Sequence, residues 1–149
     1  MKRIFLAAVA VAAATFASAQ GVTDNQIVLG QSVALTGPAQ QLGLDMQLGA
    51  TLYFNKVNAQ GGVNGRKIVL KTLDDGYESG RAAENTKKLI NDEKVFALFG
   101  YVGTPTSQAS MPIFTEAKVP FVGPFTGGLL GRAVVAQPQH AVLQLEAAA

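Results

Sequence analysis

Four short apolar runs, separated by turn-forming residues, set the pattern of hydrophobic positions along the chain. They cover residues 27–33, 67–74, 95–100 and 120–122. The third run is almost free of polar residues, as expected of a strand that is buried on both faces. Each run is followed within a few residues by glycine, proline or aspartate, which favour turns. We therefore predict four β-strands.

Between these runs lie three stretches with the hydrophobic spacing of helices, at residues 44–60, 78–91 and about 106–118. The third contains Pro112, which removes a backbone hydrogen bond inside a helix. We expect that helix to be bent, or its regular part to begin near Met111. The alternation of strands and helices with short links is typical of an α/β fold, a doubly wound parallel sheet with right-handed crossovers.

The first helix has its apolar residues at three- and four-residue steps, which predicts one stripe facing the core. The stripe consists of Leu44, Leu48, Leu52, Tyr53 and Val57. Gly49 lies in the middle of the same helix, where glycine is unfavourable relative to alanine. We expect close packing against a strand to explain this glycine.

The N-terminus has the pattern of a secretory signal peptide, residues 1–19. Lys2 and Arg3 precede an apolar run of about 13 residues, which is too short to span a bilayer. A small-residue cleavage site, Ala17-Ser18-Ala19, follows. Removing two basic and no acidic residues lowers the formal net charge from +2 to zero. With no net charge there is no basic surface to favour nucleic-acid binding. Because no cysteine is present to carry a lipid, we expect an exported product that is not membrane-anchored.

The residue content argues against an enzyme, a metal site and a bound cofactor. The chain has no cysteine, and its one histidine, His140, lies far from the strand ends. No nucleophile–base pair, nucleotide-binding loop or complete dinucleotide fingerprint is present. Asp74 and Asp75 follow the second strand and invite a metal interpretation, but two adjacent acids lack the further ligands a site needs. We expect them to cap the next helix or to lie in water.

The candidate site lies where the third and fourth strands end. Neighbouring parallel strands bring the loops 101–105 and 123–127 to one edge of the sheet, beside a helix N-terminus. Such an edge binds small anionic groups. Thr104, Thr106 and Ser107 are each able to accept a hydrogen bond where that helix begins. Thr36, after the first strand, either offers a hydrogen bond to a ligand or belongs to a plain strand-to-helix turn.

Several of these segments resemble one family closely, over roughly residues 26–127. Strand 27–33 leads into Leu35-Thr36-Gly37-Pro38, and the loops 99–104 and 119–127 match as well. The most specific piece is the run N-x-x-G-G-V-N-G-R at residues 58–66. In these features the chain is similar to the periplasmic solute-binding proteins of branched-chain amino acid ABC transporters, the leucine/isoleucine/valine-binding type of the type I periplasmic-binding fold.

The resemblance implies that residues 20–127 form a partial N-terminal ligand-binding lobe, Rossmann-like, of a two-lobed protein. In that family the first lobe holds the charged head of an amino acid through loop hydroxyls and backbone groups. By position, the corresponding residues are Gly103, Thr104, Phe125, Thr126 and Gly127, with Tyr101 and the loop 35–42 as walls of the cleft. Phe125 is bulkier than the small residue usual there. The implied partners are a small amino acid or amide and the permease subunits, in the periplasm, with no cofactor.

Residues 128–149 depart from the family pattern. They lack the next amphipathic segment and end in an alanine run, which suggests a shifted reading frame. A single lobe leaves a ligand exposed, so we expect weak binding. The sheet would also lack strands that come later in the family pattern, and the unpaired edge predicts poor solubility. Two other functions stay open: the ligand-sensing lobe of an amide- or amino-acid-responsive regulator or receptor, and a secreted α/β enzyme.

Overall fold

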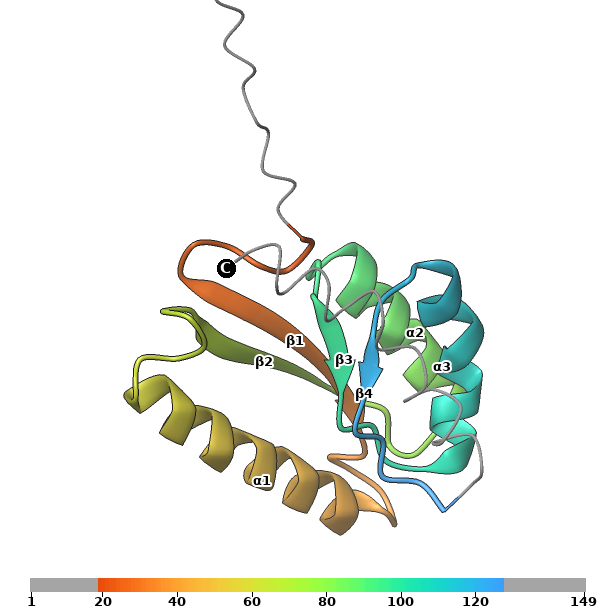
Figure 1. The fold of residues 1–149 in the computed structure, drawn as a ribbon. Helices are drawn as coiled ribbons and strands as arrows, with labels where there is room; N and C mark the ends of the chain where they lie inside the picture. The colour runs from red at the N-terminus through yellow and green to blue at the C-terminus, as the bar shows by residue number, and fades with distance from the viewer. Residues whose placement is uncertain (1–18, 128–149) are drawn as a thin grey trace, which may run out of the picture.

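The computed structural model describes residues 19–127 as four strands and three helices in strict alternation (Figure 1). The elements are β1 Gln26–Val33, α1 Gln40–Ala59, β2 Lys67–Asp74, α2 Ser79–Asn91, β3 Ala97–Phe99, α3 Thr104–Glu116 and β4 Phe121–Val122. The predicted order of elements is confirmed. The expected signal peptide falls, except for Ala19, outside the described residues, and the atypical tail and His140 lie wholly outside them.

The strands form one parallel sheet in the order β2-β1-β3-β4. The α/β class and the parallel sheet are therefore confirmed. Helix α1 lies across one face of the sheet, whereas α2 and α3 pack side by side on the other (Figure 1). Because all strands run the same way, the loops after β1, β2, β3 and β4 reach a common edge. This edge carries every residue of the predicted site.

The hydrophobic core lies between the sheet and the pair α2–α3. The rings of Phe114 and Phe121 stack with centroids 4.5 Å apart, and Tyr101 meets Phe121 edge-on at 5.0 Å. Aromatic pairs in these arrangements add to the free energy gained by burying their surface. The other buried members of this core are Val28, Leu89, Ile90, Val95 and Leu98.

Helix α1 turns a different face to the sheet from the one its apolar stripe predicted. Its buried residues are Gly43, Ala50 and Phe54. The predicted stripe is largely exposed, with 40%, 58%, 62% and 64% of the residue surface accessible at Leu44, Leu48, Leu52 and Tyr53. The reason is a close backbone approach: a Cβ on Gly43 would lie 1.9 Å from the carbonyl oxygen of Ala34.

The expectation about Gly49, and one of the two alternatives for the helix that contains Pro112, are wrong. A Cβ on Gly49 would meet no atom within 4 Å, so this glycine does not pack against a strand. Helix α3 begins at Thr104 and continues through Pro112, so its regular part does not start near Met111. Pro112 is exposed, so the carbonyl left without a helical partner can face water. Within residues 19–127 no helix is both long and apolar enough to cross a membrane.

Candidate functional site

The loops after β3 and β4 stay paired beyond the ends of the two strands. Val102 and Phe125 form a parallel bridge. The N–H of Gly103 donates to the Phe125 carbonyl at 2.9 Å, and the N–H of Phe125 donates to the Tyr101 carbonyl at 2.8 Å. This pairing carries the geometry of the strands into the loops. Thr104 and Thr126, which follow the paired residues Gly103 and Phe125, are therefore held beside each other.

Thr104 and Thr126 meet at this point. Their hydroxyl groups are hydrogen-bonded to each other, and both side chains are partly exposed. The structure thus brings together the two hydroxyls that the sequence placed at neighbouring strand ends. Their role in holding a ligand remains a prediction.

The first turn of α3 begins beside these hydroxyls without a side-chain cap. Its N-cap residue is Gly103, which has no side chain to accept a hydrogen bond, and its second residue is Pro105. Thr106 and Ser107 do not cap the helix as predicted, because Thr106 Oγ1 donates to the Val102 carbonyl at 2.6 Å and Ser107 is buried. Among residues 19–127 the Ser107 hydroxyl is buried without a hydrogen-bond partner. The helix end therefore offers uncapped N–H groups and a positive dipole.

The lack of a side chain on Gly103 leaves space for a neighbouring residue, whereas its backbone groups are already hydrogen-bonded. Its N–H and carbonyl are engaged by Phe125, Thr106 and Ser107, so the expected backbone contact to a ligand is not free in this structure. Its φ of +104° lies in a region that side chains disfavour. A Cβ here would also lie 2.6 Å from Tyr77 Cε2 and 2.9 Å from the Tyr77 hydroxyl oxygen. The ring of Tyr77 occupies the space that the missing side chain leaves.

The prediction from sequence missed Tyr77. This residue adopts a left-handed φ of +67°, which is costly for an aromatic residue. Its N–H donates to Asp75 Oδ1 at 2.8 Å, and Ser32 Oγ donates to the other oxygen of that carboxylate at 2.8 Å. Asp75 is fully buried, and this burial raises its pKa although both hydrogen bonds oppose the shift. The one signal available was the Asp-Asp-Gly-Tyr turn itself.

Asp74 ties the loops after β1 and β2 together. Its carboxylate accepts hydrogen bonds from the N–H of Leu35, Thr36 and Gly76, from Thr36 Oγ1 at 2.7 Å and from Arg81. Desolvation acts to raise the pKa of Asp74, but the bonds from Thr36, Leu35, Gly76 and Arg81 outweigh it and hold that pKa well below its usual range. Neither acid caps α2. Asp75 is buried rather than in water, whereas Asp74 remains partly exposed. Both organise loops.

This arrangement also decides how Thr36 is used. Its N–H and its hydroxyl both point at Asp74. Of the two interpretations of this loop, the structure favours the plain strand-to-helix turn. Thr36 lies at the same edge of the sheet as Thr104, but on the loop after β1, next to β2 rather than β4.

Tyr101 does not wall the cleft, and that prediction is wrong. Its side chain is fully buried on the α2–α3 side of the sheet, and its hydroxyl lies 2.9 Å from Thr86 Oγ1. Burial raises the pKa of Tyr101, although the contact with Thr86 acts against this. The reason is the side of the sheet on which the residue falls: Tyr101 packs on Phe121 in the core.

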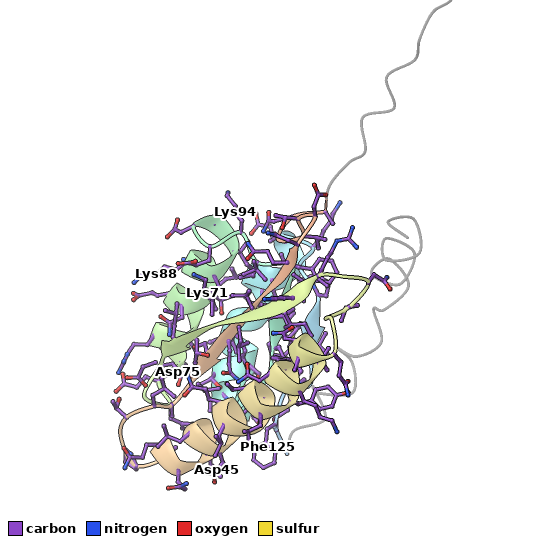
Figure 2. All side chains as sticks on the ribbon, turned by 90° about the vertical axis from the view of Figure 1, so that its left-hand side faces the viewer. Asp45, Lys71, Asp75, Lys88, Lys94 and Phe125 are labelled. Carbon is purple, nitrogen blue, oxygen red and sulfur yellow. The ribbon has the colours of Figure 1, made fainter. Side chains whose placement is uncertain are left out.

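An apolar groove of about 450 Å³ lies on the opposite, α1 side of the same edge. Phe125 lines it with its exposed ring, and Asp45 stands at the same end of α1 (Figure 2). The remaining lining residues are Leu42, Met46, Gly49, Ala50, Tyr53, Phe54 and Phe99. Gly127 is exposed, and a Cβ there would meet nothing within 4 Å. Within residues 19–127 no group of three acidic, histidine or cysteine side chains is placed to hold a metal ion.

Comparison with known proteins gives consistent matches. A family model described as "Periplasmic binding protein" matches residues 26–141. A "Leu/Ile/Val-binding protein homolog 7" of Brucella abortus (strain 2308) is 31% identical over 116 residues, which are 78% of this chain and 28% of that protein. The crystal structure of a possible leucine/isoleucine/valine-binding protein from Rhodopirellula baltica SH 1 is 39% identical with a TM-score of 0.71, covering 74% of this chain and 30% of that one.

A third relative has a different ligand in its name. A fatty acid ABC transporter substrate-binding protein from Thermomonospora curvata is 33% identical with a TM-score of 0.67, covering 72% of this chain and 27% of that one. The chain therefore spans less than a third of the length of each of these relatives. The matched family is one of binding proteins, not of enzymes. The family model covers most of the parallel-sheet fold, so the chain belongs to the periplasmic binding protein family.

Proposed function

We propose that this chain is the ligand-binding lobe of an extracytoplasmic solute-binding protein that delivers amino acids or related small carboxylates to an ABC importer. The observation that carries the proposal is the meeting of the Thr104 and Thr126 hydroxyls beside the uncapped start of α3. Hydroxyl groups and helix N-termini together favour a carboxylate. Export to the periplasm and docking on permease subunits belong to the same proposal.

Two relatives support the choice of the carboxylate as the recognised group. One is named for leucine, isoleucine and valine and another for fatty acids. Amino acids and fatty acids share a carboxylate and an apolar tail, but only amino acids carry an ammonium group. Asp74 and Asp75, on the loop after β2, are engaged by loop hydrogen bonds. An ammonium group would therefore rely on carbonyl and hydroxyl oxygens of this lobe or on Asp45, which lines the groove beside Phe125.

The test compares ligands that differ in one charged group. Purified chain is titrated by NMR with leucine, with leucinamide, which lacks the carboxylate, and with 4-methylpentanoate, which lacks the ammonium. Since the described residues supply one wall of the site, we expect Kd values of about 1 mM or weaker. Leucine and 4-methylpentanoate should shift the amide signals of Thr104 and Thr126. Equal shifts with leucinamide would refute carboxylate recognition.

A further inference from the structure

Helix α1 exposes an apolar surface that faces away from its own sheet. Leu52 lies two residues from both Ala50 and Phe54, the buried positions, which is about 200° around the helix axis. Leu44 and Leu48 precede it at four-residue steps and are also exposed. None of these leucines lines the groove beside β3 and β4. This surface therefore has no partner among residues 19–127.

The same surface carries residues with the spacing of a helix–helix contact. Asp45, Gly49, Leu52 and Lys56 follow one another at steps of four, three and four, as contact residues do in paired helices. Leu48 and Tyr53 flank this row. A Cβ on Gly49 would meet no atom within 4 Å, so the row contains a gap beside exposed apolar side chains.

The two charged residues in the row have no oppositely charged partner within residues 19–127. Asp45 accepts a hydrogen bond from Gln41 at 2.8 Å. Asp45 lies in the first half of α1, near Phe125 in Figure 2, and lines the same groove as that residue. Lys56 lies eleven positions after Asp45, which is about 16 Å along a helix. An acid and a base thus stand at opposite ends of one apolar row.

We propose that α1 pairs with α1 of a second copy of this chain in antiparallel orientation. The two-fold axis crosses the helix pair at the height of the Ala50–Thr51 peptide bond, so that positions whose numbers sum to 101 lie at the same height. A two-fold axis brings each position opposite a defined position of the other copy. Asp45 then faces Lys56 of the second copy, twice in the dimer. Leu52 faces the gap at Gly49. Leu48 and Tyr53 lie on opposite edges of the contact, each on the same side as its counterpart in the second copy.

The charges select this orientation and this occupant. Parallel pairing would set Asp45 against Asp45, Lys56 against Lys56 and Leu52 against Leu52, which repels at both ends and leaves the glycine gaps empty. Antiparallel pairing instead places each Asp45 against a Lys56 and each Leu52 against a Gly49. The proposal does not rest on ligand binding by Thr104 and Thr126, although Asp45, Gly49 and Tyr53 also line the groove beside Phe125.

Sedimentation velocity of the purified chain tests the pairing from about 1 µM to about 1 mM, the range in which a small interface dissociates. We expect a monomer–dimer equilibrium. Asp45→Lys alone and Lys56→Asp alone should each raise the dimer Kd about tenfold or more, since each turns two attractions into repulsions. The double reversal Asp45→Lys with Lys56→Asp should restore the original Kd. Leu52→Glu should also abolish dimers, and Thr51→Lys, exposed on another side of α1, should not.

The double reversal separates the pairing from damage to the fold, because a misfolded variant would not be rescued by a second charge change. A chain that stays monomeric throughout this range would overturn the proposal. So would a dimer that responds neither to single charge reversal nor to Leu52→Glu, because its interface would then lie elsewhere in the chain.

Discussion

The ring of Tyr77 lies where a side chain of Gly103 would be, with Tyr77 Cε2 2.6 Å from the position of a Cβ. Both residues have positive φ angles, +67° and +104°. The conformation is unfavourable only for Tyr77, because glycine adopts a positive φ readily, and the Tyr77 ring fits the space left by Gly103 at the loop that presents Thr104. Residues held in such conformations persist only when their surroundings fix them, and they concentrate at functional sites. Here the surroundings are the buried Asp75 carboxylate, which accepts the Tyr77 N–H, and the bridge to Phe125.

The substitution Gly103→Ala should lower the free energy of unfolding by about 1–3 kcal/mol, through backbone strain and displacement of the Tyr77 ring. Urea unfolding measures the change. Gly80→Ala is the matched control, because a Cβ there meets nothing within 4 Å. If Tyr77→Ala is added to Gly103→Ala, the combined loss should be less than the sum of the two single losses. Strict additivity would show that the ring and the glycine are not coupled.

The pH dependence of stability should reveal the role of Asp74. The hydrogen bonds that Asp74 accepts lower its pKa from the usual value of 3.8. A group whose pKa is lower in the folded state stabilises the fold above its unfolded pKa, and this contribution is lost as the pH falls through the folded value. Asp74→Asn should therefore destabilise the protein by about 2 kcal/mol at pH 7. The difference from wild type should shrink as the pH falls below 3.8.

Unfolding experiments at pH 7 and at pH 3 measure both parts of this prediction. Asp24→Asn serves as the control, since Asp24 is exposed and lies outside the proposed interface on α1. A loss of stability in Asp74→Asn that is equally large at both pH values would contradict the account. The cost would then come from altered packing rather than from the charged form of the carboxylate.

The orientation of α1 can be tested by truncating one residue on each side. Phe54 is buried and packs against Phe99 with ring centroids 5.3 Å apart, whereas Leu52 is largely exposed. Phe54→Ala should cost about 3–5 kcal/mol of stability. Leu52→Ala, measured at a concentration at which the chain is monomeric, should change stability by about 0.5 kcal/mol or less. The reverse order would restore the orientation that the sequence pattern suggested.

The fold followed from the sequence because the strands are short apolar runs and their connections alternate with helices. The packed face of α1 did not, because periodicity finds an apolar stripe but cannot tell a stripe that faces the core from one that faces outward. The deciding residue is Gly43, whose contact with Ala34 fixes the rotation of the helix. A close backbone approach of this kind depends on tertiary structure and leaves little trace in local sequence.

The candidate site was predictable in part for the same reason. Parallel strands place Thr104 and Thr126 at one edge, and the structure joins their hydroxyls. Tyr101 was misplaced because a loop residue can turn to either side of the sheet, and here it entered the core. Tyr77 was missed because its position depends on a buried carboxylate and a left-handed backbone, neither of which an amino-acid pattern displays.

The central claim is that Thr104 and Thr126 together hold the carboxylate of the solute. Its most direct test is an NMR titration with leucine of wild-type chain, Thr104→Val, Thr126→Val and the control Thr115→Val, an exposed position near the far end of α3. Valine keeps the shape of threonine and removes only the hydroxyl. We predict that each site variant stays folded and weakens binding by about tenfold, the effect of one lost hydrogen bond to a charged group, while Thr115→Val binds as wild type does. Unchanged leucine binding by folded Thr104→Val and Thr126→Val would contradict the account.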